Sequence, residues 1–354
     1  MTYNIAVLAG DGIGPEVIGQ AIRLLEIISQ KEKVEFILRE GLIGAIAIDR
    51  TGSALPDETL RLCRSSDAIL MGAVGHPKYD NDPTAKIRPE QGLLKIRKEL
   101  GLYANIRPIT TYPVLNQISP LKEERLKDVD FVVYRELTGG IYFGNKGRNE
   151  DGTQAYDHCN YSVSEIQRIS RMAFDAANVR KKKLTLVDKA NVLETSRLWR
   201  ETVKELSKDY PDVQLDFMFV DAASMRIIQN PGYFDVILTE NMFGDILTDE
   251  ASVITGSIGL LPSASIGKGS ALFEPIHGSY PEGAGKNIAN PFAAILSMGM
   301  MLGYLGMKNA EQKVRKAVEA ALTEGITTPD IDPVNNVSTS DVGDWMVNYL
   351  AIRY

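Results

Sequence analysis

The sequence predicts an α/β fold with a mostly parallel central sheet. Strand-like and helix-like segments alternate along the 354 residues, the pattern of chains in which helical crossovers join the strands. Several strand-like segments are short and continuously apolar, as expected for strands buried on both faces. At about 150 residues per domain, the length also suggests two domains.

Seven apolar runs are the expected strands, and helical patterns occupy most of the chain between them. The expected strands span residues 5–9, 34–39, 68–71, 131–134, 184–187, 215–220 and 236–239. The expected helices span residues 15–29, 57–63, 164–178, 194–208, 222–229, 291–305 and 311–324.

Two segments interrupt this alternation. Glycine-rich turns interleave with aromatic residues in 137–161, which fits either a solvent-exposed loop or a β-hairpin arm that pairs with another subunit. Residues 256–291 are rich in Gly, Ser and Pro with little periodicity, so we expect a long loop, which in a compact domain is usually functional.

Composition excludes several classes of protein. The net charge of −7 is spread without blocks, which does not fit a nucleic-acid or anionic-lipid surface. Two cysteines cannot form a disulfide framework or a zinc cluster. Residues 287–307 carry no charge but contain Asn, Pro and Gly, so we expect a buried core or interface helix rather than a membrane span. With no signal-peptide pattern at the first residues, we expect a cytoplasmic protein.

The turn Gly10-Asp-Gly-Ile-Gly14 follows the first expected strand and precedes a helix, as a dinucleotide fingerprint would. The G-x-G-x-x-G spacing fails, however, because Pro15 stands where the third glycine belongs. Pro is favoured at the first position of a helix. We therefore interpret the segment as a tight strand-to-helix turn.

A pair of carboxylates predicts a metal site. Asp245 and Asp249 are four residues apart and would share one face of a helix, about 6 Å apart along its axis. No basic residue lies near them in sequence, so they would repel each other unless a cation is bound. Asp221, which follows an expected strand, could supply a third ligand, and three hard oxygen ligands suit Mg²⁺ or Mn²⁺. A solvent-facing pair of aspartates is the alternative.

Basic residues at the ends of elements predict an anionic substrate. Arg97 is expected on one helix face with Glu90, Leu93 and Leu94. Arg107 follows ten residues later and Arg135 ends a strand. Because guanidinium groups grip carboxylates at two points, three arginines could clamp a multiply anionic molecule. Any one of these arginines taken alone is better explained as a surface residue.

Lys189 and Tyr142 are candidates for acid–base chemistry. Lys189 follows a strand end, where α/β proteins often place functional groups, and a partly buried lysine near cations can act as a base. Tyr142 could then act as an acid. Taken singly, a solvent-exposed lysine and a half-buried tyrosine explain these residues as well.

Taken together, these segments resemble one family, the metal-dependent β-hydroxyacid oxidative decarboxylases that include isocitrate and isopropylmalate dehydrogenases. The resemblance rests on residues 10–16, 86–94, 135–144, 188–192, 243–247 and 277–291. It implies an isopropylmalate dehydrogenase-like two-domain fold, which is not a Rossmann fold. Residues 1–102 plus 256–354 would form the first domain, on the cofactor side. Residues 103–255 would form the second, with the metal site, the interface of a homodimer and an intersubunit arm near 144–160.

The resemblance also implies a role for each candidate residue. Three arginines would hold substrate carboxylates: Arg97, Arg107 and Arg135. Asp245 and Asp249 would bind one Mg²⁺ or Mn²⁺, together with Asp221 of the partner subunit, which would also contact the substrate. Lys189, also from the partner, would be the base and Tyr142 would help to protonate the enolate, so that each active site is shared between subunits. The substituent of the substrate would meet Glu90, Leu93, Leu94 and Val192.

The cofactor implied by the resemblance is NAD, bound on the loop around 277–290 rather than on the glycine turn. Its expected contacts are Glu274, His277, Gly278, Ser279, Glu282, Gly283 and Asn290. Glu282 is acidic and should repel a 2′-phosphate, which favours NAD over NADP. Gly283 stands where some members of the family carry a larger apolar residue. The resemblance also suggests activation by a monovalent cation.

The activity expected from the resemblance is NAD-dependent oxidative decarboxylation of 3-isopropylmalate in leucine biosynthesis. A related enzyme acting on tartrate or D-malate is the alternative within the family. Leu93 and Leu94 argue against it, because a small polar substituent gains little from apolar neighbours. From another class, a non-catalytic two-domain protein that closes on a carboxylate ligand would explain the arginines but not the Lys189 and aspartate set.

Overall fold

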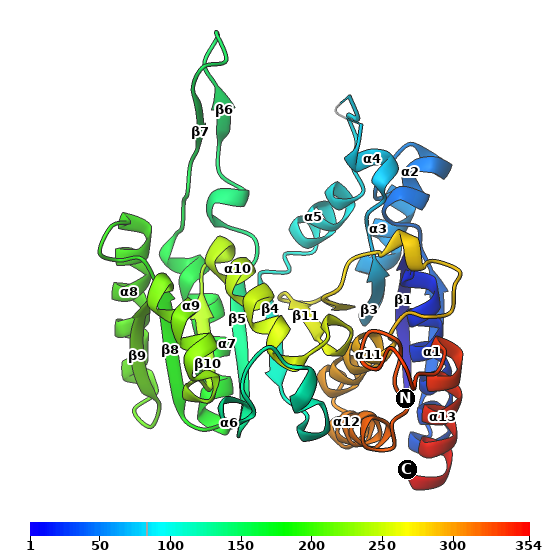
Figure 1. Cartoon of the computed structure of the whole chain (residues 1–354). Helices are drawn as coiled ribbons and strands as arrows, with labels where there is room; N and C mark the ends of the chain where they lie inside the picture. The colour runs from blue at the N-terminus through cyan, green and yellow to red at the C-terminus, as the bar shows by residue number, and fades with distance from the viewer. Residues whose placement is uncertain (83) are drawn as a thin grey trace. The chain divides into compact units, whose positions relative to one another are not determined.

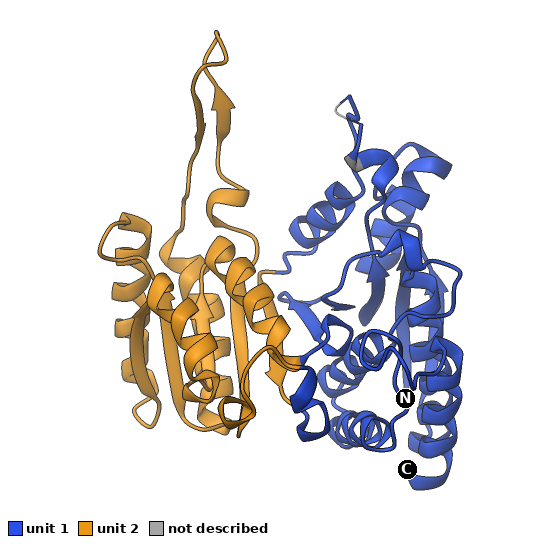
Figure 2. Cartoon of the chain, in the orientation of Figure 1, with its two compact units in different colours: residues 1–102, 112–118, 256–354 blue, residues 103–111, 119–255 orange. Residues whose placement is uncertain are grey.

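The computed structural model describes residues 1–82 and 84–354, which divide into two compact units. Unit 1 contains residues 1–102, 112–118 and 256–354, and unit 2 contains residues 103–111 and 119–255 (Figure 2). The sequence analysis predicts residues 112–118 in the second domain, whereas the structure groups them with unit 1. Their short 3₁₀ helix η1 (Pro113–Ile118) packs against α12 of unit 1.

Unit 1 is built on five strands in the order β2-β1-β3-β12-β11. All neighbours run parallel except the antiparallel pair β11–β12. The strands are β1 (Thr2–Gly10), β2 (Glu35–Glu40), β3 (Ala68–Ala73), β11 (Pro262–Ile266) and β12 (Ala271–Pro275). The helices are α1 (Gly14–Glu32), α2 (Ala45–Thr51), α3 (Asp57–Arg64), α4 (Pro77–Asp80), α5 (Glu90–Glu99), α11 (Phe292–Tyr304), α12 (Lys308–Thr323) and α13 (Thr339–Arg353). Short 3₁₀ helices η6 (Ile258–Leu260) and η7 (Pro281–Gly283) complete the unit.

The core of unit 1 follows from apolar patterning. Strand β3 is buried along its whole length, and Leu8 and Ile69 pack into one cluster with Leu60 and Ile96. Helix α11 is apolar on nearly every side and contacts β11, β12, α1 and α12. The uncharged stretch 287–307 therefore contains a helix buried in the core of unit 1, one of the two alternatives expected for it. Across residues 1–82 and 84–354, no helix combines the length and apolar character that a bilayer crossing requires.

Unit 2 is built on five strands of the large sheet, in the order β4-β5-β10-β8-β9. They run parallel except for the antiparallel pair β4–β5. The strands are β4 (Ala104–Thr110), β5 (Asp130–Glu136), β8 (Lys183–Asp188), β9 (Gln214–Phe219) and β10 (Val236–Thr239). The helices are α6 (Glu123–Leu126), α7 (Val163–Val179), α8 (Glu194–Leu206), α9 (Val220–Gln229) and α10 (Asn241–Ser252). Short 3₁₀ helices are η2 (Gly140–Tyr142), η3 (Ser207–Asp209), η4 (Pro231–Tyr233) and η5 (Val253–Thr255).

A two-stranded hairpin projects from unit 2 (Figure 1). It consists of β6 (Lys146–Arg148) and β7 (Ala155–Asp157), which pair antiparallel and are largely exposed. The segment 137–161 therefore contains a β-hairpin and is not an irregular loop. That this hairpin pairs with another subunit stays a prediction.

The α/β class with mostly parallel strands is confirmed, and three local expectations need correction. Residues 256–291 contain β11 and β12 and are not one long loop. Strand β4 was not foreseen, because it carries Arg107 and Pro108 in place of a continuous apolar run. Strand β9 ends at Phe219, so Asp221 lies in the first turn of α9 and not at a strand end.

Candidate active site

Helix α10 presents the predicted pair of carboxylates in unit 2. The helix begins directly after β10, and the side chain of Glu240 caps it by accepting a hydrogen bond from the backbone N–H of Phe243. Asp245 and Asp249 lie within this helix, one turn apart, as predicted. Asp245 is one-third exposed and Asp249 is two-thirds exposed, so both carboxylates can reach a ligand in solution.

Two buried arginines from the antiparallel pair β4–β5 contact these carboxylates. The Nη1 atom of Arg135 lies 2.6 Å from Asp245 Oδ1, and Nη1 of Arg107 lies 3.3 Å from Asp249 Oδ1. Arg107 also donates to Asn105 at 2.8 Å and to the hydroxyl of Thr248 at 2.6 Å. Predicted substrate-binding and metal-binding side chains thus meet in one cluster.

This contact changes one reason for expecting a metal. The two aspartates do not need a cation to relieve their repulsion, because Arg135 and Arg107 neutralise them from other strands. This neutralisation could not be predicted from neighbours in the sequence, because Arg135 and Asp245 are 110 positions apart. The case for a metal rests on the chemistry of the donors, which are hard carboxylate oxygens.

Asn241 and Glu136 organise the cluster, and the sequence analysis overlooked both. The side-chain oxygen of Asn241 accepts hydrogen bonds from Arg135, and its amide donates to the carbonyl of Gly139 at 3.0 Å. Glu136 is fully buried and accepts from the backbone N–H groups of Thr138 and Gly139. These bonds shape the loop that leads to Tyr142. The sequence feature that could have identified Glu136 is its position at the end of a strand, shortly before a Thr-Gly-Gly turn.

Tyr142 joins the same cluster. Its hydroxyl donates to Asp245 Oδ2 at 2.8 Å, and its ring lies under the guanidinium group of Arg135. Partial burial, with the hydrogen bond to Asp245 as the second cause, raises the pKa of Tyr142 to about 12. The phenol is therefore protonated at neutral pH and can act as a proton donor.

Lys189 forms a separate pair with Asp221. Its Nζ atom lies 2.6 Å from Asp221 Oδ1, and this hydrogen bond lowers the pKa of the Asp221 carboxyl. The preceding residue, Asp188, is buried and bound at two points by Arg200, which fixes the strand end from which Lys189 extends. Val192 follows in an exposed turn.

Asp221 does not join Asp245 and Asp249 in one chain. Within residues 1–82 and 84–354, no three His, Cys, Asp or Glu side chains are close enough to hold one metal ion. A single chain thus offers two partial sets of groups: the cluster on α10 and the Lys189–Asp221 pair.

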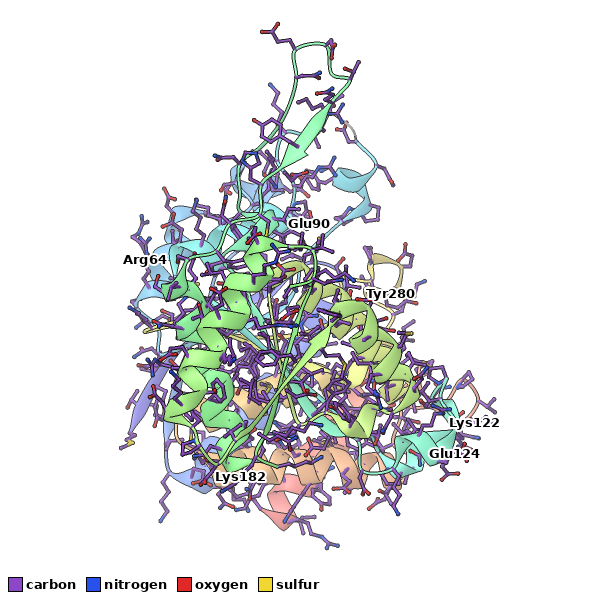
Figure 3. The ribbon with its side chains drawn as sticks, turned by 90° about the vertical axis from the view of Figure 1, so that its left-hand side faces the viewer. Arg64, Glu90, Lys122, Glu124, Lys182 and Tyr280 are labelled. Atoms are coloured by element: carbon purple, nitrogen blue, oxygen red, sulfur yellow. The ribbon has the colours of Figure 1, made fainter. Side chains whose placement is uncertain are left out.

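In unit 1, helix α5 carries the predicted substrate-facing residues. Glu90, labelled in Figure 3, is exposed at the first position of the helix. Leu94 is 42% exposed, whereas Leu93 packs partly against the core. The side chain of Arg97 is nearly buried, and its Nη2 atom lies 3.0 Å from Oε1 of Glu274 in β12. Glu274 is one of the predicted cofactor contacts. An ion pair therefore connects α5 to the strand that leads into the 277–290 segment.

The 277–290 segment holds the remaining predicted cofactor residues. His277 is buried, and burial lowers its pKa, so the ring is neutral. Its Nδ1 lies 2.9 Å from the carbonyl of Gly278, which leaves Nε2 as a buried acceptor with no hydrogen-bond partner among the described residues. Glu282 and Gly278 are exposed. Asn290 is committed internally, to Asp330 and to the first turn of α11.

The glycine turn at residues 10–14 packs against the backbone of this segment. The carbonyl of Ser279 accepts from the backbone N–H of Ile13 at 2.8 Å, and Gly12 touches Ser279 so closely that a Cβ there would lie 1.9 Å from its carbonyl oxygen. Asp11 is buried and accepts from the N–H groups of Ala45 and Ile46, at the start of α2. The turn is thus a packing element, as the failed fingerprint suggested.

Comparisons with known proteins agree with this fold. The family model for isocitrate/isopropylmalate dehydrogenase matches residues 4–346. The chain is 51% identical over 352 residues to the 3-isopropylmalate dehydrogenase of Bacteroides fragilis, covering 99% of each chain. It is 53% identical to that of Aquifex aeolicus, covering 98% of this chain and 97% of the relative. The crystal structure of isocitrate dehydrogenase from Methylococcus capsulatus matches with a TM-score of 0.87 at 33% identity, covering 99% of each chain. The chain belongs to the isocitrate/isopropylmalate dehydrogenase family.

Proposed function

We propose that the protein catalyses the NAD- and divalent-metal-dependent oxidative decarboxylation of 3-isopropylmalate to 4-methyl-2-oxopentanoate and CO₂, the reaction of leucine biosynthesis. The observation that carries the proposal is the cluster on α10, where two buried arginines, two aspartates and a protonated tyrosine converge. Similarity over nearly the full length to relatives named 3-isopropylmalate dehydrogenase supports the choice of substrate.

The arginines would bind the two carboxylates of the malate. Arg107 and Arg135 are buried and preorganised by neutral partners, Asn105, Thr248 and Asn241. Fixed guanidinium groups bind a carboxylate at a smaller entropic cost than flexible ones. Arg97, held by Glu274, would complete the contacts to the substrate.

The residues present fit the two absent groups. Asp245 and Asp249 offer hard oxygens for Mg²⁺ or Mn²⁺. Nε2 of the neutral His277, which has no hydrogen-bond partner among the described residues, can accept a hydrogen bond from NAD. When bound, NAD accepts a hydride from the carbinol carbon and the divalent cation stabilises the negative charge left as CO₂ departs. The exposed carboxylate of Glu282 favours a ribose diol over a 2′-phosphate.

Lys189 and Tyr142 would move the protons. We propose that Nζ of Lys189 takes the hydroxyl proton of the substrate and that the phenol of Tyr142 protonates the carbon that loses CO₂. Because Lys189 pairs with Asp221 and not with the α10 cluster, we propose that both act in the active site of a partner subunit within a homodimer.

The side chains of α5 would select the substituent. Leu94 is exposed and available to the isopropyl group, with Leu93 behind it against the core. Apolar contact of this kind discriminates by about 1–3 kcal/mol per methylene. D-malate and tartrate should therefore be poorer substrates, not excluded ones.

The direct test is NADH formation, followed by absorbance with Mn²⁺ and K⁺ present. The substrates are 3-isopropylmalate, D-malate, tartrate and isocitrate, each with NAD and with NADP. Preference for 3-isopropylmalate with NAD is the expected result. Preference for D-malate or tartrate would keep the chemistry and reject the role of the two leucines. Binding of a carboxylate without turnover would identify a binding protein.

The shared site has its own test. Lys189→Ala and Asp245→Asn each inactivate one contribution to a site. A heterodimer of the two variants contains one site with both changes and one with neither, so it should regain up to about half of the wild-type activity per dimer. No recovery in verified heterodimers would place each active site within one chain.

A further inference from the structure

Tyr280 adopts a backbone conformation that residues with a side chain rarely take. Its φ is 39°, in the left-handed region, within the segment that holds the predicted cofactor contacts. Left-handed backbone at a residue other than glycine costs free energy and persists only where surrounding contacts impose it, often at binding sites. The side chain is nevertheless 50% exposed, so burial of the ring does not explain the conformation.

The ring of Tyr280 lies over the backbone of Gly283. A Cβ at position 283 would lie 2.3 Å from Cε1 and 2.5 Å from Cδ1 of the ring, so that only glycine fits beneath it. Gly283 itself is buried. Because Gly283 has no side chain, it leaves room for the ring of Tyr280.

The turn that carries Tyr280 and Gly283 is fixed at several points. The backbone N–H of Gly283 donates to the carbonyl of Tyr280 at 3.0 Å, and the carbonyl of Ser279 is held by Ile13. The backbone N–H of Gly285 donates to the carboxylate of Glu16. A half-exposed aromatic ring on a rigid turn is a preorganised stacking surface, because little rotational freedom remains to be lost on binding. Figure 3 labels Tyr280 on this segment.

The neighbours of the ring indicate what would stack on it. Glu282 is an exposed carboxylate two residues away, suited to a diol. His277 contributes to the same segment a buried acceptor that no described residue bonds. An aromatic face, a diol-binding carboxylate and a hydrogen-bond acceptor together match the adenosine part of a dinucleotide. The aromatic face suits the adenine ring, and the carboxylate suits the ribose diol.

We propose that Tyr280 is a cofactor-binding residue: its ring, which lies over the backbone of Gly283, stacks against the adenine ring of NAD. The inference rests on the proposed function, which puts NAD on this segment. It also gives Gly283 a role, since the ring supplies the surface that a larger apolar side chain at position 283 would otherwise provide.

The test is equilibrium binding of NAD and of AMP to the full-length protein by calorimetry. Tyr280→Ala should weaken both by about 5- to 100-fold, the range for losing one base–aromatic stack. Tyr280→Phe keeps the ring and should stay within about twofold of wild type. Tyr304→Ala is the control, a half-exposed tyrosine at the far end of α11, and should change neither ligand.

A second pair of variants separates stacking from a merely structural role. Gly283→Ile in the wild-type background should weaken NAD binding, because the new side chain displaces the ring. Gly283→Ile combined with Tyr280→Ala should bind NAD more tightly than Tyr280→Ala alone, because an apolar surface is restored. This reversal of sign would not arise if Tyr280 only stabilised the turn.

Two outcomes overturn the inference in distinguishable ways. If wild type binds NAD and turns over but Tyr280→Ala binds NAD and AMP equally well, the role of Tyr280 is rejected while the proposed function stands. If wild type binds neither ligand and forms no NADH, the proposed function and the inference fail together.

Discussion

Replacing Glu136 by Gln tests whether a buried carboxylate shapes the loop that carries Tyr142. Glu136 is fully buried, and its Oε2 accepts from the N–H groups of Gly139 at 2.7 Å and Thr138 at 3.0 Å. Its Oε1 accepts from the hydroxyl of Thr138 and from Arg168. Glutamine keeps one oxygen and puts an NH₂ group at the other position, where it faces N–H donors.

The magnitude follows from these contacts. Hydrogen bonds to a charged acceptor contribute about 1.5–3 kcal/mol each, and the substitution disrupts about two of them. Breaking a buried ion pair costs about 3–5 kcal/mol. Because the side chain of Arg168 is 30% exposed and can regain water, we expect the lower end, about 3 kcal/mol.

Hydrogen exchange at the amides of Thr138 and Gly139 measures this directly. A loss of about 3 kcal/mol in local stability should accelerate their exchange by about two orders of magnitude. Glu201→Gln, an exposed glutamate on α8, is the matched control and should leave both amides unchanged. The reasoning fails if Glu136→Gln folds and the exchange of Thr138 and Gly139 equals that of wild type.

Three further substitutions test the chemistry and the electrostatics. Lys189→Ala should lower kcat by about 10²- to 10⁴-fold, the usual contribution of a general base, while calorimetry still detects NAD binding; a near-normal kcat would reject the base role. Asp245→Asn should raise the half-saturating Mg²⁺ concentration by at least about tenfold, and an unchanged metal titration would remove it from the ligands. Burial raises the pKa of Glu240 above its usual 4.5, so the folded state favours the protonated carboxyl. The free energy of unfolding of wild type therefore falls as the pH rises from 4.5 through the raised pKa. The melting temperature of Glu240→Gln relative to wild type should therefore rise across that window, and a difference independent of pH would contradict the assignment.

The sequence was sufficient for the elements that follow a simple period. For α10 the sequence analysis assumed a helix from the four-residue spacing of Asp245 and Asp249, and the structure confirms both the helix and their shared face. Buried parallel strands such as β3 and β10 were predictable because they are continuously apolar. By contrast β11 is built largely from Pro, Ser and Ala, and β12 has only a three-residue apolar run before Glu274 and Pro275. Their sheet membership depends on pairing with each other and with β3, which no local pattern encodes.

The partners of the site residues were beyond the reach of sequence patterns. The salt bridge between Arg135 and Asp245 joins strand β5 to helix α10 across 110 positions, and it reverses the electrostatic interpretation of the aspartates as unneutralised charges. The same limitation hid Asn241, whose amide connects Arg135 to the loop of Tyr142. Long-range pairing of polar groups is determined by topology, so it becomes visible only when the strands are in place.

The turn at Gly10 shows why a glycine motif must be interpreted through the atoms beside it. In a dinucleotide fingerprint the missing side chains allow a phosphate to approach. Here a Cβ at Gly10 would meet the carbonyl oxygen of Ala73 at 2.0 Å, and one at Gly12 would meet that of Ser279 at 1.9 Å. Carbonyl oxygens repel phosphate, so these glycines are required by close packing of backbone against backbone. One of those contacts holds the segment that contains His277 and Tyr280. Under the proposed function, the turn would therefore support cofactor binding only by positioning that segment, and would not bind a phosphate itself.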